Sequence, residues 1–158
     1  MKPAWSDIKL LVLDFDGVLT DGFVYVDQDG RESVRCSRRD SLGIGMLKEK
    51  GVPTVVISKE RNGVVAARCA KMEIECHSGV DGKLALLKGL LAEKGIDAAQ
   101  VCYVGDDAND AECLRYAGIG VAVADALPPA RDAADHVTRA KGGDHAVREV
   151  CDLILETK

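Results

Sequence analysis

Short apolar stretches of this sequence are followed, at two places, by aspartates that could act in catalysis or hold a metal ion. Asp14 and Asp16 follow the first stretch. Asp106, Asp107 and Asp110 follow a later one. Carboxylates gathered in one place repel each other unless a cation lies among them. Because ligand sets made only of oxygen, with room left for water, favour Mg²⁺ over Zn²⁺, these aspartates predict a magnesium site if the fold brings them together.

Two further polar side chains stand at related positions. Ser58 follows the apolar stretch Thr54–Ile57, and Lys83 opens a leucine-rich segment that is typical of a helix. In an open parallel sheet, ligands bind beyond the carboxyl ends of the strands. We therefore expect Ser58 and Lys83 to lie near the aspartates.

The segments that would position these residues alternate between strand-like and helix-like patterns. Short runs of branched apolar residues predict strands at Ile8–Leu13, Thr54–Ile57, Val101–Val104 and Gly120–Val123. Apolar residues at helical spacing predict helices at Ser41–Lys50, Asn62–Met72, Lys83–Lys94, Asp107–Tyr116, Pro128–Ala134 and Ala146–Leu155. This alternation is typical of an α/β fold, here a Rossmann-like parallel sheet with helices on both faces.

One segment departs from the alternation. Phe23–Val26 and Glu32–Arg35 flank Asp27–Gly30, and a turn containing Asp-Gly between two alternating segments predicts a β-hairpin. The length of 158 residues suits one compact core, so we expect residues 1–158 to form one domain.

Composition and charge narrow the class of protein. Hydrophobic residues make up 47% and charged residues 30% of the chain, as in ordinary soluble globular proteins. The net charge of −5 and the lack of a Lys/Arg block argue against nucleic acid or an anionic membrane as the main partner and favour a small molecule. Without a signal-peptide pattern at the N-terminus, we expect a cytoplasmic protein. The six cysteines are dispersed and predict free thiols, not a zinc site.

The candidate residues carry a family resemblance. Asp14–Val18 reads Asp-Phe-Asp-Gly-Val and resembles the D-x-D-G-[TV] signature of the haloacid dehalogenase superfamily. Ser58 is similar to the second motif of that superfamily, Lys83 to the third, and Gly105–Asp110 to the fourth. The four motifs occur in the right order across most of the chain.

This resemblance implies a magnesium-dependent phosphatase. Asp14 would be the nucleophile that forms an aspartyl phosphate, and Asp16 would protonate the leaving group and then activate water. Mg²⁺ would be held by the Asp14 carboxylate, the Asp16 backbone carbonyl and the Asp106 carboxylate. Asp110 and, with less weight, Asp107 would orient Lys83 and metal-bound water.

The phosphate-binding side of the site is also implied by the resemblance. Ser58, the backbone N–H groups that follow it, and Lys83 would bind the phosphoryl oxygens. Lys59 and Arg61 would lie at the substrate, and Glu60 would either contact the substrate or fix Arg61. Simpler structural roles compete with these expectations: Asp107 could cap the helix after it, Ser58 could merely end a strand, and Lys83 could be a solvated helix lysine.

The resemblance extends to a branch of the superfamily without a cap domain, since the intervals between the motifs leave no room for one. That branch acts on 2-keto-3-deoxy sugar-acid phosphates and forms homotetramers through hairpins, which the apolar Phe23 and Tyr25 would suit. Ser58–Asn62 resembles nonulosonate 9-phosphate phosphatases of the sialic acid type, so a 9-phosphate is the expected substrate. An octulosonate 8-phosphate remains open, as does a noncatalytic oligomerisation module related to sialate cytidylyltransferases.

The C-terminal segment Gly142–Glu149 is similar to a tail of the same branch that can reach a neighbouring site. It departs from that tail at Asp144 and His145, where an Arg-Gly pair is common. Arg39 and Arg61 are alternative partners for the carboxylate of the substrate.

Overall fold

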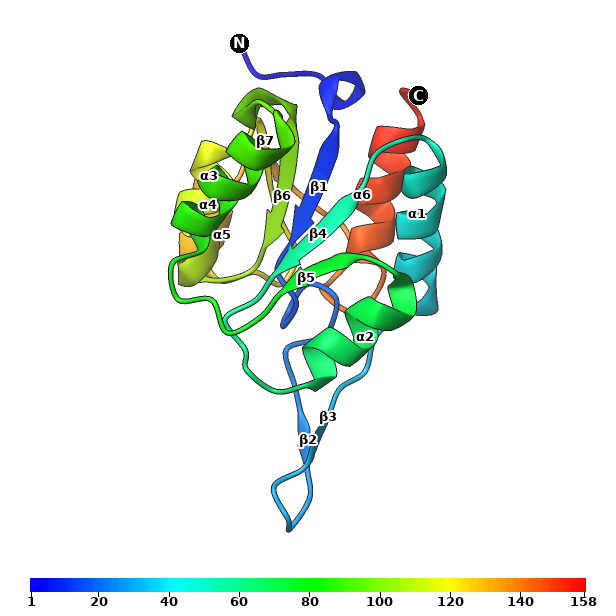
Figure 1. Ribbon diagram of the computed structural model, residues 1–158, viewed down its shortest axis with the longest axis vertical. Coiled ribbons are helices and arrows are strands. Elements are labelled where there is room, and N and C mark those ends of the chain that lie inside the picture. The colour runs from blue at the N-terminus through cyan, green and yellow to red at the C-terminus, as the bar shows by residue number, and fades with distance from the viewer.

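The central strands consist mostly of leucine, valine and isoleucine and are buried on both faces, as a parallel sheet between two helical layers requires. A computed structural model describes residues 1–158, and its main feature is a six-stranded sheet in which all neighbouring strands are parallel (Figure 1). The strands lie in the order β5 (Glu75–His77), β4 (Thr54–Ile57), β1 (Leu10–Leu13), β6 (Val101–Gly105), β7 (Ile119–Ala122) and β8 (His136–Val137).

The strand order reverses beside β1. From β1 the chain passes to β4 and β5 on one side, and then returns to β6 on the other side of β1 before adding β7 and β8. Such a reversal opens a crevice beyond the carboxyl ends of the two strands that flank it. The residues that follow β1 and β6 therefore meet at this crevice.

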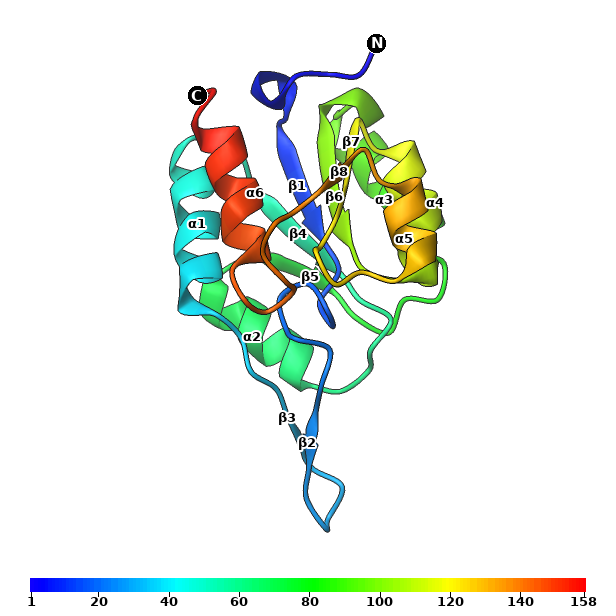
Figure 2. The same ribbon diagram turned by 180° about the vertical axis from the view of Figure 1, so that it is seen from behind.

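Helices cover both faces of the sheet, which confirms the predicted fold class (Figure 2). One layer contains α1 (Arg38–Glu49), α2 (Val64–Met72) and α6 (Ala146–Leu155). The other contains α3 (Lys83–Lys94), α4 (Ala111–Tyr116) and α5 (Pro128–Ala133). Short 3₁₀ helices span Trp5–Asp7, Ala98–Gln100 and Ala108–Asp110.

The predicted hairpin is present and extends away from the body of the molecule (Figure 1). Its strands β2 (Tyr25–Val26) and β3 (Glu32–Ser33) are shorter than the sequence pattern indicates. The side chains of Phe23, Tyr25 and their neighbours are exposed. No cap domain is present, since the hairpin and α1 occupy the interval between the first two motifs.

Most predicted elements are confirmed, and Thr54–Ile57, Lys83–Lys94 and Ala146–Leu155 match to the residue. The sequence patterns missed β5 and β8, which are short edge strands of mixed polarity. The expected helix Asp107–Tyr116 begins as a 3₁₀ turn and becomes α-helical only at Ala111. None of the helices combines the length and apolar character needed to cross a membrane.

Candidate active site

The register of the sheet brings the first and fourth motifs side by side. Leu13, the last residue of β1, pairs with Val56 on one side and with Val104 on the other. The backbone N–H of Asp14 continues this pairing, because it donates to the carbonyl of Val104 at 3.0 Å. Asp14 therefore leaves the sheet at the crevice, directly beside the loop that carries Asp106.

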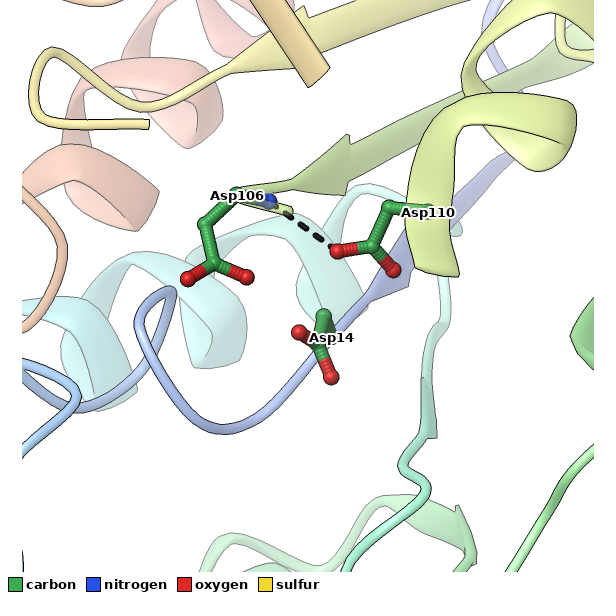
Figure 3. A group of neighbouring side chains, drawn as sticks. All are labelled: Asp14, Asp106 and Asp110. Carbon is green, nitrogen blue, oxygen red and sulfur yellow. Dashed lines mark hydrogen bonds between the residues drawn. The ribbon is translucent and has the colours of Figure 1, made fainter. Parts of the chain in front are cut away.

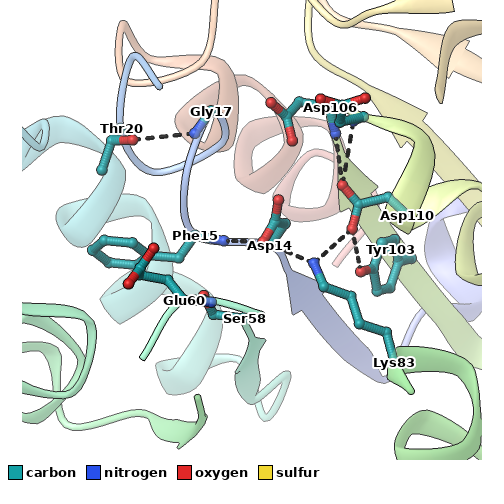
Figure 4. Close-up of polar contacts among 11 residues, drawn as sticks. Asp14, Phe15, Gly17, Thr20, Ser58, Glu60, Lys83, Tyr103, Asp106 and Asp110 are labelled. Carbon is teal, nitrogen blue, oxygen red and sulfur yellow. Dashed lines mark hydrogen bonds and ion pairs between the residues drawn. The ribbon is translucent and has the colours of Figure 1, made fainter. Parts of the chain in front are cut away.

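Lys83 joins two aspartates inside the protein (Figure 4). Its Nζ lies 2.9 Å from Oδ1 of Asp14 and 2.9 Å from Oδ1 of Asp110. All three side chains are buried. A buried lysine needs such partners, so the reading of Lys83 as a solvated helix residue is wrong.

Asp110 accepts hydrogen bonds from four donors. Oδ1 accepts from Lys83 and from the hydroxyl of Tyr103, at 2.9 and 2.7 Å. Oδ2 accepts from the backbone N–H groups of Asp106 and Asp107, at 3.0 and 3.4 Å. With both oxygens engaged in this way, Asp110 holds Lys83 and the fourth-motif loop in place.

The carboxylates of Asp14, Asp106 and Asp110 form a cluster with one oxygen of each within 4.8 Å of the others (Figure 3). Because the oxygens of Asp110 already accept four hydrogen bonds, Asp14 and Asp106 are the two that remain for a cation. Oδ2 of Asp14 and the backbone carbonyl of Asp16 accept no hydrogen bond within the chain. These oxygen donors fit a hard divalent ion such as Mg²⁺.

The electrostatics of the cluster also call for a cation. Burial, followed by the charge of Asp110, raises the pKa of Asp14 well above its ordinary value, although Lys83 opposes the shift. Burial raises the pKa of Asp106 to about 6. Burial alone would lower the pKa of Lys83, but Asp14 and Asp110 raise it above its ordinary value. A divalent ion would offset both the burial and the mutual repulsion that raise the pKa of these carboxyl groups.

A cavity of about 650 Å³ opens above this cluster. No hydrophobic residue lines it, and six carboxylates face only two basic side chains. The lining residues are Asp14, Asp16, Gly22, Ser58, Lys59, Glu60, Arg61, Asp81, Asp106, Asp107 and Asn109. An anionic ligand could enter so acidic a cavity only together with a cation.

Asp16 lies at the cavity and is half-buried. Burial, and after it the charges of Glu60 and Glu32, raise the pKa of Asp16. A carboxyl group with a raised pKa holds its proton closer to neutral pH, as a general acid requires.

The loop after β4 differs in detail from what the sequence predicts. The Ser58 hydroxyl accepts from the N–H of Glu60, and the Glu60 carboxylate accepts from the N–H groups of Arg61 and Asn62 at 2.9 and 3.0 Å. Most of the N–H groups expected to bind phosphate therefore have acceptors within the loop. The N–H of Lys59 has none, so it is the one that remains for a phosphoryl oxygen.

Other candidate residues fall into two groups. Asp107 lines the cavity but also accepts from the N–H of Ala108, so the capping role that competed for this residue is present. Arg61 lines the cavity and lies 3.6 Å from Asp81. Arg39 and the Asp144–His145 pair do not line it.

Several residues of the site escaped the sequence patterns. Tyr103 lies in a strand whose residues are all buried, so no alternation marks it, although a buried hydroxyl always calls for a partner. Glu32 of the hairpin accepts from Asn62 at 2.7 Å and so links the hairpin to the loop after β4. Nothing local in the sequence signals that contact.

Comparison with protein families gives a match to the haloacid dehalogenase-like hydrolases over residues 44–150. The 3-deoxy-D-manno-octulosonate 8-phosphate phosphatase of Escherichia coli strain K12 is 41% identical over 151 residues, which cover 95% of this chain and 80% of the relative. These similarities confirm the resemblance read from the motifs.

Solved structures with the same fold are also similar to this chain. One is the 3-deoxy-D-manno-octulosonate 8-phosphate phosphatase of Moraxella catarrhalis with magnesium, phosphate and KDO, which has a TM-score of 0.94 and 35% identity and covers 98% of this chain and 89% of its own. The cobalt-bound enzyme of the same name from Haemophilus influenzae has a TM-score of 0.92 and 34% identity, with coverage of 97% and 90%. These similarities do not support the expected preference for nine carbons, and the eight-carbon alternative fits them better.

Proposed function

Because this chain belongs to the haloacid dehalogenase-like hydrolases and is a phosphatase that uses Mg²⁺, we propose that it hydrolyses 3-deoxy-D-manno-octulosonate 8-phosphate. The observation that carries the proposal is Lys83 held between Asp14 and Asp110 beneath an acidic cavity. Burying these three charged side chains costs free energy, because each of them needs a partner, and a protein without catalysis would gain nothing from the arrangement. It argues against a noncatalytic oligomerisation module.

Asp14 is the nucleophile in this proposal. Lys83 and the N–H of Phe15 hold Oδ1 of this carboxylate, which orients the side chain for attack on phosphorus. As the new bond to phosphorus forms, the bond from phosphorus to the sugar oxygen breaks. The product on the enzyme is an aspartyl phosphate, which divides the hydrolysis into two displacements.

Asp16 moves the protons. Its carboxyl group donates a proton to the sugar oxygen as that oxygen leaves, and the resulting carboxylate then takes a proton from water. The oxygen of that water attacks phosphorus and releases inorganic phosphate and the free Asp14. The raised pKa of Asp16 supports this double role.

The residues that would hold Mg²⁺ are Asp14, Asp106 and the backbone carbonyl of Asp16. When bound there, the ion offsets the repulsion between the carboxylate nucleophile and the phosphate dianion. Lys83, Ser58 and the N–H of Lys59 would bind phosphoryl oxygens on the other side. Asp110 would act by orienting Lys83.

The sugar would occupy the outer part of the cavity. Lys59, Glu60 and Arg61 line this part, and they are exposed. The two basic residues are suitable partners for the carboxylate of a sugar acid. The similarity of Ser58–Asn62 to nonulosonate phosphatases makes a nine-carbon 9-phosphate the competing substrate.

We place the protein in the cytoplasm and propose that it is a homotetramer. The hairpin has exposed apolar residues that suit packing against other copies of the chain, at Phe23–Val26. Neither nucleic acid nor a membrane is a partner in this proposal.

The test is phosphate release from purified octulosonate 8-phosphate and nonulosonate 9-phosphate with Mg²⁺. We expect kcat/KM to be at least about tenfold higher for the eight-carbon ester, which corresponds to about 1.4 kcal/mol of transition-state binding. Excess chelator should abolish turnover, and Mg²⁺ should restore it. A higher kcat/KM for the nine-carbon ester would reverse the substrate assignment.

The variant Asp14→Asn tests the covalent step. Its side chain keeps the shape of aspartate but loses the nucleophile, so we expect turnover to vanish while the folded structure, followed by circular dichroism, persists. Near-normal phosphate release from this variant would refute the mechanism, whichever sugar is used.

A further inference from the structure

The loop that carries Asp16 is wound into a tight turn after β1. The carbonyl of Phe15 accepts from the N–H groups of Val18, Leu19 and Thr20. The hydroxyl of Thr20 accepts from the N–H of Gly17 at 3.1 Å, as Figure 4 shows. These bonds shape the turn but do not by themselves set its position relative to Asp14.

A turn from the C-terminal part of the chain, Gly142–Gly143, packs directly against this loop. The N–H of Gly143 donates to the carbonyl of Val18 at 3.0 Å. A Cβ on Gly142 would overlap the carbonyl of Gly17, and a Cβ on Gly143 would overlap the backbone of Thr20 and Asp21. The two backbones are therefore as close as glycine allows.

The Gly142–Gly143 turn is itself anchored from both sides. The N–H of Gly142 donates to Oδ1 of Asp125, in the loop after β7, at 3.0 Å. Just before the turn, the N–H groups of Arg139 and Ala140 donate to the Glu149 carboxylate of α6. The turn is thus a fixed support and not a free tail.

We propose that the Gly142–Gly143 turn positions the general acid, by fixing the loop on which Asp16 lies. The inference rests on the proposed function, because it needs Asp16 to protonate the leaving group. Asp14 is held separately, through the N–H bond to Val104 and the bond to Lys83. Displacement of the loop should therefore impair proton transfer to the leaving group more than nucleophilic attack.

Two substrates separate these effects. The sugar oxygen of octulosonate 8-phosphate leaves as an alkoxide and needs a proton from Asp16, whereas p-nitrophenolate leaves p-nitrophenyl phosphate readily without one. A shift of the loop should lower turnover of the sugar ester by about ten- to a hundredfold, because displacement of a catalytic group such as Asp16 by about 1 Å slows a reaction by this order of magnitude. Turnover of the aryl ester should stay within about threefold of the unmodified enzyme.

The variant Gly143→Ala places a methyl group against Thr20 and Asp21. Its matched control is Gly51→Ala, because Gly51 has φ +78°, close to the +71° of Gly143, but has open space around it. Both variants carry the same backbone strain, and only one disturbs the loop. We expect the selective loss on the sugar ester for Gly143→Ala alone.

A second pair of variants keeps the test decisive should Gly143→Ala fail to fold. Asp125→Ala removes the acceptor for Gly142 without adding bulk, and Asp125→Asn retains an oxygen there. We expect Asp125→Ala to show the same selective loss and Asp125→Asn to restore the sugar ester. Equal loss on both esters, or no loss on either, in Asp125→Ala would overturn the inference. An unmodified enzyme that hydrolyses no sugar-acid phosphate would instead contradict the proposed function.

Discussion

Replacing Tyr103 with phenylalanine removes a single hydrogen bond from the buried group that holds Lys83 against Asp14. The hydroxyl of Tyr103 lies 2.7 Å from Oδ1 of Asp110, the same oxygen that accepts from Lys83 at 2.9 Å. Tyr103 is fully buried, and phenylalanine keeps its ring, so the packing around β6 is preserved. The substitution therefore affects mainly the orientation of the Asp110 side chain.

The size of the effect follows from the number of donors. A hydrogen bond to a charged group contributes about 1.5–3 kcal/mol. Three donors would still hold Asp110, so we expect only about 1.4 kcal/mol to be lost from the transition state, a tenfold fall in kcat. Because Tyr103 does not line the cavity, KM should change less than about twofold.

The assay is a double-mutant cycle on kcat for octulosonate 8-phosphate. If Tyr103 acts through Asp110, then Tyr103→Phe should cost little further once Asp110→Asn is present. Tyr116→Phe, at the surface of α4, is the matched control and should leave kcat unchanged. Costs that add fully in the double variant would mean that Tyr103 acts independently of Asp110, and the reasoning would fail.

Two further predictions concern stability. Asp40 is buried with one oxygen lacking a partner, and burial raises its pKa to about 6. The protonated carboxyl group of Asp40 therefore contributes to the stability of the folded protein below about pH 4, and this contribution is lost as the pH rises through about 6. Asp40→Asn should therefore raise the free energy of unfolding at about pH 7.5 by up to about 3 kcal/mol, and by much less at about pH 4; an equal gain in denaturant titrations at both would contradict this assignment. His145 has a left-handed backbone, with φ 79°, so His145→Gly should stabilise the protein by about 1 kcal/mol, and a lower melting temperature would show that the side chain outweighs the strain.

The sequence was sufficient for the fold class, for most helices and strands, and for the residue types of the site. Those inferences depend on local patterns: branched apolar runs for β4, leucines at helical spacing for α3, and a turn with Asp-Gly for the hairpin. The order of parallel strands then implies that the residues after β1 and β6 meet at one edge of the sheet. The structure does bring Asp14, Lys83 and Asp106 together there.

Resemblance over a short segment was a less dependable guide to the identity of the substrate. The five residues Ser58–Asn62 pointed to a nine-carbon sugar, whereas similarity over 95% of the chain favours the eight-carbon one. A short exposed loop carries few constraints, and here the Glu60 carboxylate binds the N–H groups of its own loop. The sequence of this loop therefore depends on the geometry of the loop as much as on the identity of the substrate.

Only the tertiary structure could assign the supports of the site. Tyr103 with Asp110, Glu32 with Asn62, and the Gly142–Gly143 turn against the Asp16 loop are contacts that no nearby pattern marks. The physical reason is that periodicity and turn chemistry act within about ten residues along the chain, while these contacts depend on how whole strands and loops pack. A glycine that is needed because another backbone presses against it looks, in the sequence, like any glycine in a turn.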